Sequence, residues 1–167
     1  FSNTFCNNSI CSPSRASILT GQYSHINGVT KLRGTLRPDV PMFTKELQKA
    51  GYTTALVGKW HLRNDPEGYD YHVRVLDQGT YFNPELIGSE TLAPKGYSAD
   101  LFTDIALQWL DKKRDKTKPF MMSLHFKAVH SAFECPKRYD ALYANETIPE
   151  PRTLYENLDD SGQPLKK

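Results

Sequence analysis

The sequence predicts an α/β fold in which a largely parallel sheet is flanked by helices. Residues 53–57 and 119–126 have the apolar composition of buried strands. Residues 41–50 and 98–110 carry apolar residues at helical spacing. Helix, strand, helix and strand in this order favour a parallel sheet, because a crossover helix returns the chain to the same end of the sheet.

Composition limits both the class of the protein and its partners. The 167 residues are 38% hydrophobic and 24% charged, which is typical of a globular domain. Lysine and arginine number 21 against 19 acidic residues, and this balance does not favour nucleic acid or an anionic membrane surface as the main partner. No apolar run is long enough to cross a membrane. We therefore expect one domain with a core of its own.

The first helix is predicted over residues 11–21, Cys-Ser-Pro-Ser-Arg-Ala-Ser-Ile-Leu-Thr-Gly. Ser12 can cap its start, and Pro13 suits the first helical position, where no N–H is needed. Gly21 can adopt the left-handed conformation that ends a helix. Cys11 is therefore expected at a helix N-terminus.

Cys11 and Arg15 together predict a site for an anion. Free N–H groups and the positive end of the helix dipole favour negative charge beside Cys11, and Arg15 adds a forked set of donors one turn later. The expected ligand is an anionic ester, on which a thiol could act as nucleophile. A thiol phosphatase loop is one interpretation, but such loops usually have a longer spacing than the three residues found here between cysteine and arginine.

Two segments predict loops. Residues 22–38 are rich in glycine and basic residues, which either face an anionic substrate or are solvated. Residues 62–97 contain many aromatic residues and prolines with little periodicity, and we expect a long, partly ordered excursion that walls a pocket. Its aromatic rings either stack on sugar rings or pack inside the fold.

Polar residues follow the predicted strand 53–57, which comes after the helix 41–50. Lys59 and His61 lie at the C-terminal end of this strand, where open α/β sheets form ligand sites. On an extended segment, side chains two residues apart project to the same side. We therefore expect Lys59 and His61 to face one site.

The second half of the chain predicts a helix followed by another strand. Ser98 can cap the helix. Its apolar face consists of Leu101, Phe102, Ile105, Ala106, Trp109 and Leu110. After the strand 119–126, Lys127 to His130 lie at its C-terminal end, whereas His125 is expected to be packed within the strand rather than to bind a ligand.

Three of these stretches resemble sequence patterns of the sulfatase family. The pattern C-x-P-S-R followed by L-T-G is matched by Cys11, Pro13, Ser14, Arg15, Leu19, Thr20 and Gly21. The second signature is matched by Gly51, Tyr52, Thr54, Gly58, Lys59, Trp60 and His61. A third pattern, F-x-x-A-P-H, is matched by Phe126, Ala128 and His130, with Val129 in place of proline.

The resemblance implies an alkaline-phosphatase-like sulfatase fold and a sulfuric ester hydrolase. In the family the cysteine is oxidised to formylglycine by a formylglycine-generating enzyme, so Cys11 is implied to be the modified residue and, as the aldehyde hydrate, the nucleophile. Arg15 would hold the hydrate. Lys59 would bridge the hydrate and the sulfate, and His61 would act as the base. His130 would bind the ester oxygen and help to protonate the leaving alcohol.

The implied substrate is a sulfated small molecule or glycan. Residues 68–84 and 127–130 resemble bacterial glycan sulfatases, including those acting on 6-sulfated N-acetylglucosamine. The alternatives are an aryl or choline sulfatase, a phosphonate or phosphate ester hydrolase, and an inactive truncated fragment. The resemblance also implies a periplasmic or secreted protein, or a lysosomal one in a eukaryote.

A divalent cation, commonly calcium, is implied as cofactor, with Cys11 as formylglycine among its ligands. The family's carboxylate ligands lie on a strand before the formylglycine motif and on a later strand. No Asp precedes Cys11, and Asp159-Asp160 has the wrong order. Residues 1–167 are thus expected to form part of a single sulfatase catalytic domain, without its first strand and C-terminal portion, and to be weakly active or inactive alone.

Three cysteines are present. If Cys11 becomes formylglycine, Cys6 and Cys135 remain. They either pair in an oxidising compartment or stay as free thiols.

Overall fold

The computed structural model describes residues 3–151, which belong to two compact units. The first unit ends at Glu134 and contains the sheet, the α-helices and the candidate site. The second unit begins at Cys135. In its described part, residues 135–151, the chain forms a short 3₁₀-helix, η2 (Lys137–Tyr139), and otherwise consists of turns and extended segments.

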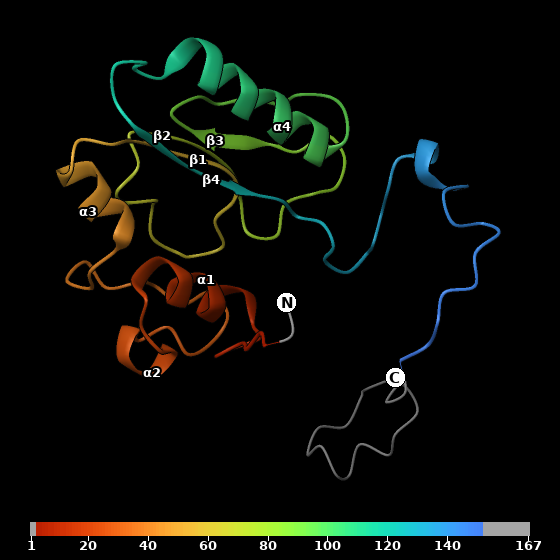
Figure 1. The fold of residues 1–167 in the computed structure, drawn as a ribbon, viewed down its shortest axis with the longest axis horizontal. Coiled ribbons are helices and arrows are strands. Elements are labelled where there is room, and N and C mark those ends of the chain that lie inside the picture. Colours follow the sequence, from red (N-terminus) through yellow and green to blue (C-terminus); the bar gives the residue numbers. More distant parts are fainter. Residues whose placement is uncertain (1–2, 152–167) are drawn as a thin grey trace. The chain divides into compact units, whose positions relative to one another are not determined.

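A four-stranded sheet forms the centre of the first unit (Figure 1). Its strands are β1 (Thr53–Lys59), β2 (Tyr71–Val75), β3 (Leu86–Gly88) and β4 (Phe120–His125), in the order β3-β2-β1-β4. Strand β1 pairs in parallel with both β2 and β4, and β3 adds to β2 in the antiparallel direction. The predicted α/β fold with a largely parallel sheet is confirmed.

Helices cover both faces of this sheet (Figure 1). They are α1 (Cys11–Thr20), α2 (Ser24–Asn27), α3 (Phe43–Lys49) and α4 (Ser98–Gln108), which continues as a π-helical turn, η1 (Trp109–Lys113). Figure 1 shows α4 on one side of the sheet and α1 to α3 on the other. Among residues 3–151, no helix combines the length and the apolar character that crossing a membrane requires.

Strand β1 divides the hydrophobic core into two clusters. Successive side chains of a strand point to opposite faces, and Leu56 and Val57, both fully buried, belong to different clusters. Leu56 packs with Ala16 and Leu19 of α1, whereas Val57 packs with Phe102 of α4. The central strand therefore fixes the positions of α1 and α4 at the same time.

Most predicted elements are present, and the structure corrects two expectations. Residues 62–97, predicted to form a long, partly ordered excursion, instead contribute two strands, β2 and β3, to the sheet. These strands are only five and three residues long and owe their position to pairing with neighbours, a long-range effect that local periodicity does not show. Ser12 and Ser98 do not cap their helices, whose N-cap residues are Ile10 and Tyr97.

Gly58 allows β1 and β4 to approach closely, and its replacement should destabilise the fold. Gly58 has a φ of 108°, and a Cβ atom there would lie 2.0 Å from the carbonyl oxygen of His125. We expect Gly58→Ala to lower the free energy of unfolding by more than about 3 kcal/mol, measured by urea denaturation. Gly51→Ala is the matched control, because Gly51 has a φ of 88° but no atom within 4 Å of the added Cβ. It should cost only about 1 kcal/mol; equal losses would contradict the steric explanation.

Candidate active site

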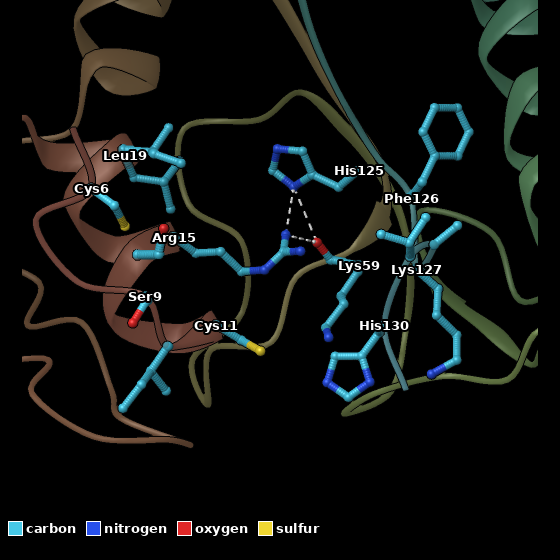
Figure 2. Close-up of a pocket in the computed structure, with 15 residues that line it drawn as sticks. Cys6, Ser9, Cys11, Arg15, Leu19, Lys59, His125, Phe126, Lys127 and His130 are labelled. Atoms are coloured by element: carbon cyan, nitrogen blue, oxygen red, sulfur yellow. Dashed lines mark hydrogen bonds between the residues drawn. The ribbon is translucent and has the colours of Figure 1, made fainter. Parts of the chain in front are cut away.

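A pocket of about 610 Å³ lies between the first turn of α1 and the C-terminal ends of β1 and β4 (Figure 2). The polar side chains that matter for its chemistry are those of Cys11, Arg15, Lys59, His125, Lys127 and His130. In Figure 2, Cys11 and Lys59 point toward one another from opposite sides of the pocket. The structure therefore brings together four of the five predicted site residues and leaves His61 out of the lining.

Helix α1 is held at the strand ends by a buried serine. Ser12 is fully buried, and its Oγ donates a hydrogen bond to the carbonyl oxygen of His61 at 2.7 Å. The same Oγ accepts one from the backbone N–H of Arg33 at 3.1 Å. The hydroxyl is thus used in contacts between segments far apart in the sequence, which explains why it does not cap the helix.

Arg15 connects the helix to both strands that flank the pocket. Its NH1 group donates to the carbonyl oxygen of Lys59 at 2.7 Å and lies 3.2 Å from His125 Nδ1. Burial lowers the pKa of the Arg15 guanidinium, and the nearby Cys11 opposes that shift. A guanidinium stays protonated in proteins, so the pocket keeps a fixed positive charge.

Lys59 and Lys127 add two ammonium groups that are both nearly fully buried. Lys59 Nζ donates to Gln78 Oε1, and Lys127 Nζ donates to the Gln78 carbonyl oxygen at 3.3 Å. Burial lowers the pKa of Lys59, and the positive charges of Arg15 and Lys127 lower it further, against the opposite effect of Cys11 and Asp77. Positive charge is therefore concentrated at this site.

His125 is part of the pocket, which the sequence did not indicate. Its Nδ1 lies 3.1 Å from the Lys59 carbonyl oxygen and also contacts Arg15. Burial, and then the positive charge of Arg15, lower the pKa of His125 to about 4. The imidazole is thus neutral at pH 7. It packs in the strand as expected, but it also faces the pocket.

His61 lies beside a second pocket, of about 310 Å³, which Arg33 and Asp77 also line. Its backbone has a left-handed φ of 58°, so the chain is not extended at this residue and the expectation that Lys59 and His61 face one site is wrong. His61 Nε2 lies 3.0 Å from Asp77 Oδ1. Burial lowers the pKa of His61, and Lys59 lowers it further, whereas Asp77 raises it.

His130 reaches the first pocket from the segment after β4. Its position is fixed through the backbone, because Tyr81 donates a hydrogen bond from its hydroxyl to the His130 carbonyl oxygen at 2.5 Å. The imidazole is half-buried, with Nδ1 lying 3.1 Å from Ser131 Oγ. The His130 imidazole can therefore contact a ligand at the wall of the pocket.

The sequence left open whether the basic loop 22–38 faces a substrate and whether the cysteines pair. Arg33 pairs with Asp77 at 2.7 Å and Arg37 with Asp39 at 3.3 Å, and neither arginine lines the first pocket. Cys6, Cys11 and Cys135 are free thiols in this structure.

The donors at this site do not fit a calcium ion. Across residues 3–151, no group of three or more His, Cys, Asp or Glu side chains could hold a metal. The pocket is lined by cations, whereas Ca²⁺ is bound by several carboxylate and carbonyl oxygens. Asp159 and Asp160 lie outside the described residues.

From the sequence, His125 was assigned to the strand and Lys127 to its C-terminal end, neither with a role in the pocket. Two further residues near the site were missed altogether, Asp77 and Gln78. The last two follow β2, which is parallel to β1 and therefore ends at the same edge of the sheet. The alternation of Val73 and Val75 with polar neighbours was the available signal for this strand. With the strand identified, its C-terminal end would have pointed to Asp77 and Gln78.

Comparisons with known proteins give a consistent result. The Sulfatase family profile matches residues 1–161. An N-acetylglucosamine-6-O-sulfatase of Bacteroides thetaiotaomicron is 39% identical over 172 residues, which cover 100% of this chain and 30% of the relative. Arylsulfatase J of Mus musculus is 29% identical, covering 78% of this chain and 26% of that protein.

A solved structure of a protein in complex with its substrate D-glucosamine-2-N,6-O-disulfate is also similar. It superposes with a TM-score of 0.85 at 40% identity, covering 93% of this chain and 32% of that one. The chain thus spans about a third of the length of these relatives.

The low pKa of His125 should make the fold acid-sensitive. The unfolded chain takes up a proton at the ordinary imidazole pKa of about 6.5, whereas folded His125 resists protonation until about pH 4. Its contribution to stability is complete above pH 6.5 and is lost as the pH falls toward 4, by up to about 3 kcal/mol. Urea denaturation between pH 7 and 4.5 measures this loss, which should be smaller in His125→Gln. An NMR titration midpoint of His125 near pH 6.5 would contradict the assignment.

Proposed function

This chain belongs to the sulfatase family, and we propose that the protein carrying it hydrolyses sulfate esters of a carbohydrate. The observation that supports this most is the pocket in which Cys11, at the start of α1, lies among Arg15, Lys59 and His130. Buried cations around a half-exposed side chain suit an anionic ester and the negative charge that develops in its hydrolysis.

We propose that Cys11 is converted to formylglycine by a formylglycine-generating enzyme. The position fits such a side chain, because Cys11 opens into the pocket beside Arg15 and opposite Lys59 (Figure 2). The aldehyde hydrate supplies two hydroxyls on one carbon. One attacks sulfur, so that an S–O bond forms as the alcohol leaves; deprotonation of the other then breaks the C–O bond to the sulfated oxygen, which releases sulfate and regenerates the aldehyde. Water then restores the hydrate.

Arg15 and Lys59 would stabilise the negative charge. Arg15 uses NH1 to contact the Lys59 carbonyl oxygen and still has Nε and NH2 to offer to the residue-11 side chain. Lys59, which points across the pocket, would bind a sulfate oxygen and the attacking hydroxyl. Both cations are fixed before the substrate binds, so little reorganisation is needed during the reaction.

Two histidines would move protons. His130, at the wall of the pocket, would bind the ester oxygen and protonate the leaving alcohol. His61 would accept the proton of the second hydroxyl. His61 does not line the pocket, but its carbonyl oxygen accepts a hydrogen bond from Ser12, the residue after Cys11. The positive charges of Lys59 and Arg15 also act on the His61 imidazole.

For the substrate, we propose 6-sulfated N-acetylglucosamine. The support is the 39% identity to an N-acetylglucosamine-6-O-sulfatase and the likeness to a structure with a disulfated glucosamine. Aryl and choline esters and phosphonate or phosphate esters are the alternatives, as is an inactive fragment. A periplasmic, secreted or lysosomal location remains part of this proposal; one relative, 28% identical, is named a putative extracellular sulfatase.

The substrate class can be tested on the full protein that carries this chain. Its kcat/KM should be at least about tenfold higher for 6-sulfated N-acetylglucosamine than for the matched 6-phosphate and an aryl sulfate. In the same preparation, the peptide containing residue 11 should have CHO in place of CH₂SH by mass spectrometry. Cys11→Ala should abolish turnover. Turnover of the phosphate ester alone would refute the proposal that the protein is a sulfatase. Full activity with an unmodified Cys11 thiol would refute the proposal that formylglycine is the nucleophile.

The role of Lys59 predicts a large kinetic effect. Lys59→Ala removes a buried cation from the pocket and should lower kcat for the sulfate ester by roughly a hundredfold to a thousandfold. Lys49→Ala is the control, because Lys49 lies on the surface and pairs with Glu46. It should leave kcat unchanged. Full turnover by a folded Lys59→Ala protein would exclude this lysine from the mechanism.

A further inference from the structure

His61, Asp77 and Arg33 form a connected group at the edge of the sheet. Asp77 Oδ1 lies 3.0 Å from His61 Nε2, and Asp77 Oδ2 accepts a hydrogen bond from Arg33 NH2 at 2.7 Å. Each carboxylate oxygen therefore has its own partner. The arginine fixes the carboxylate, and the carboxylate in turn faces one nitrogen of the imidazole.

The other nitrogen of His61 has no hydrogen-bond partner within the described chain. His61 Nδ1 is buried and has no hydrogen-bond partner among the described residues, and the side chain as a whole is only 3% exposed. A buried polar atom without a partner is costly, and such atoms are uncommon in folded proteins. A general base needs a free electron pair before its substrate binds, and the unpartnered Nδ1 of His61 can supply one.

The backbone of His61 is fixed as firmly as its side chain. Ser12 Oγ donates to the His61 carbonyl oxygen and accepts from the Arg33 N–H, so one hydroxyl connects both residues to the first turn of α1. Asp77 follows β2, and His61 follows β1, its parallel neighbour. The carboxylate and the imidazole thus meet because two strands end side by side.

We propose that Asp77, clamped by Arg33, is a positioning residue that fixes the tautomer of His61, with the proton on Nε2 and the free electron pair on Nδ1. This inference rests on the proposed function, in which His61 is the base. A carboxylate accepts hydrogen bonds and cannot donate one, so only the Nε2–H tautomer satisfies the contact. Nδ1 is then the nitrogen that takes the proton.

Asp77 also offsets the charge that His61 gains. When Nδ1 accepts a proton from the second hydroxyl of the residue-11 hydrate, the imidazole becomes positive while Nε2–H stays bonded to Asp77. Burial and the charges of Lys59 and Arg15 oppose that positive charge, and Asp77 favours it. The histidine can therefore act as a base in surroundings that are otherwise cationic.

The test is Asp77→Asn in the full protein, with the imidazole nitrogens of His61 observed by ¹⁵N NMR. The His61 signals are assigned by their loss in His61→Gln. In the unaltered protein, Nε2 should show the shift of a protonated nitrogen and Nδ1 that of an unprotonated one. Asparagine can donate to Nε2, so Asp77→Asn should populate the Nδ1–H tautomer. It should also lower kcat roughly tenfold to a thousandfold with KM nearly unchanged.

Asp65→Asn is the matched control, because Asp65 pairs with Arg74 near the same pocket and does not contact His61. It should change neither the tautomer nor kcat. A proton on Nδ1 in the unaltered protein overturns the inference without any variant, and so does an unchanged tautomer in Asp77→Asn. Full turnover by His61→Ala would instead overturn the proposed base, whatever the tautomer, so the two failures can be told apart.

Discussion

The parallel pairing of β1 with both β2 and β4 is the constraint on which the rest of the structure depends. Parallel strands end at the same edge of a sheet, so the residues that follow them must meet there. Lys59 at the end of β1, Gln78 after β2 and Lys127 after β4 are far apart in the sequence. They nevertheless form one hydrogen-bonded group, in which Gln78 accepts from both lysines. Helix α1 then needs only to be attached to this edge, which Ser12 and Arg15 accomplish.

This arrangement concentrates positive charge on side chains that are buried or half-buried. Arg15, Lys59 and Lys127 all line the first pocket, and no carboxylate lies among the lining residues in the described part of the chain. Burial lowers the pKa of Lys59 most, and repulsion by Arg15 and Lys127 lowers it further. A bound anion would relieve both the repulsion and the cost of burial, because it supplies the opposite charge that the protein withholds. The site is therefore organised for a negative ligand before one arrives.

The sequence predicted the parts of this site that depend on local signals. The first helix was placed correctly, with Cys11 at its start and Gly21 in the left-handed conformation at its end, because proline and glycine are local signals for the two ends of a helix. Residues 41–50, 53–57 and 98–110 were likewise assigned from periodicity. Strands β2 and β3 were missed because their stability comes from neighbours in the sheet, and Asp77 was missed with them.

The orientation of His61 shows a different limit of sequence reasoning. Its spacing from Lys59 is right for two side chains on one face, but the left-handed backbone at His61 breaks the extended conformation on which that inference relied. The turn lets the imidazole meet Asp77, while its carbonyl oxygen meets Ser12. His61 contacts Asp77, which follows β2, through its side chain, and it contacts Ser12 of α1 through its backbone. The departure from regular geometry is therefore what connects helix α1, which begins at Cys11, to His61.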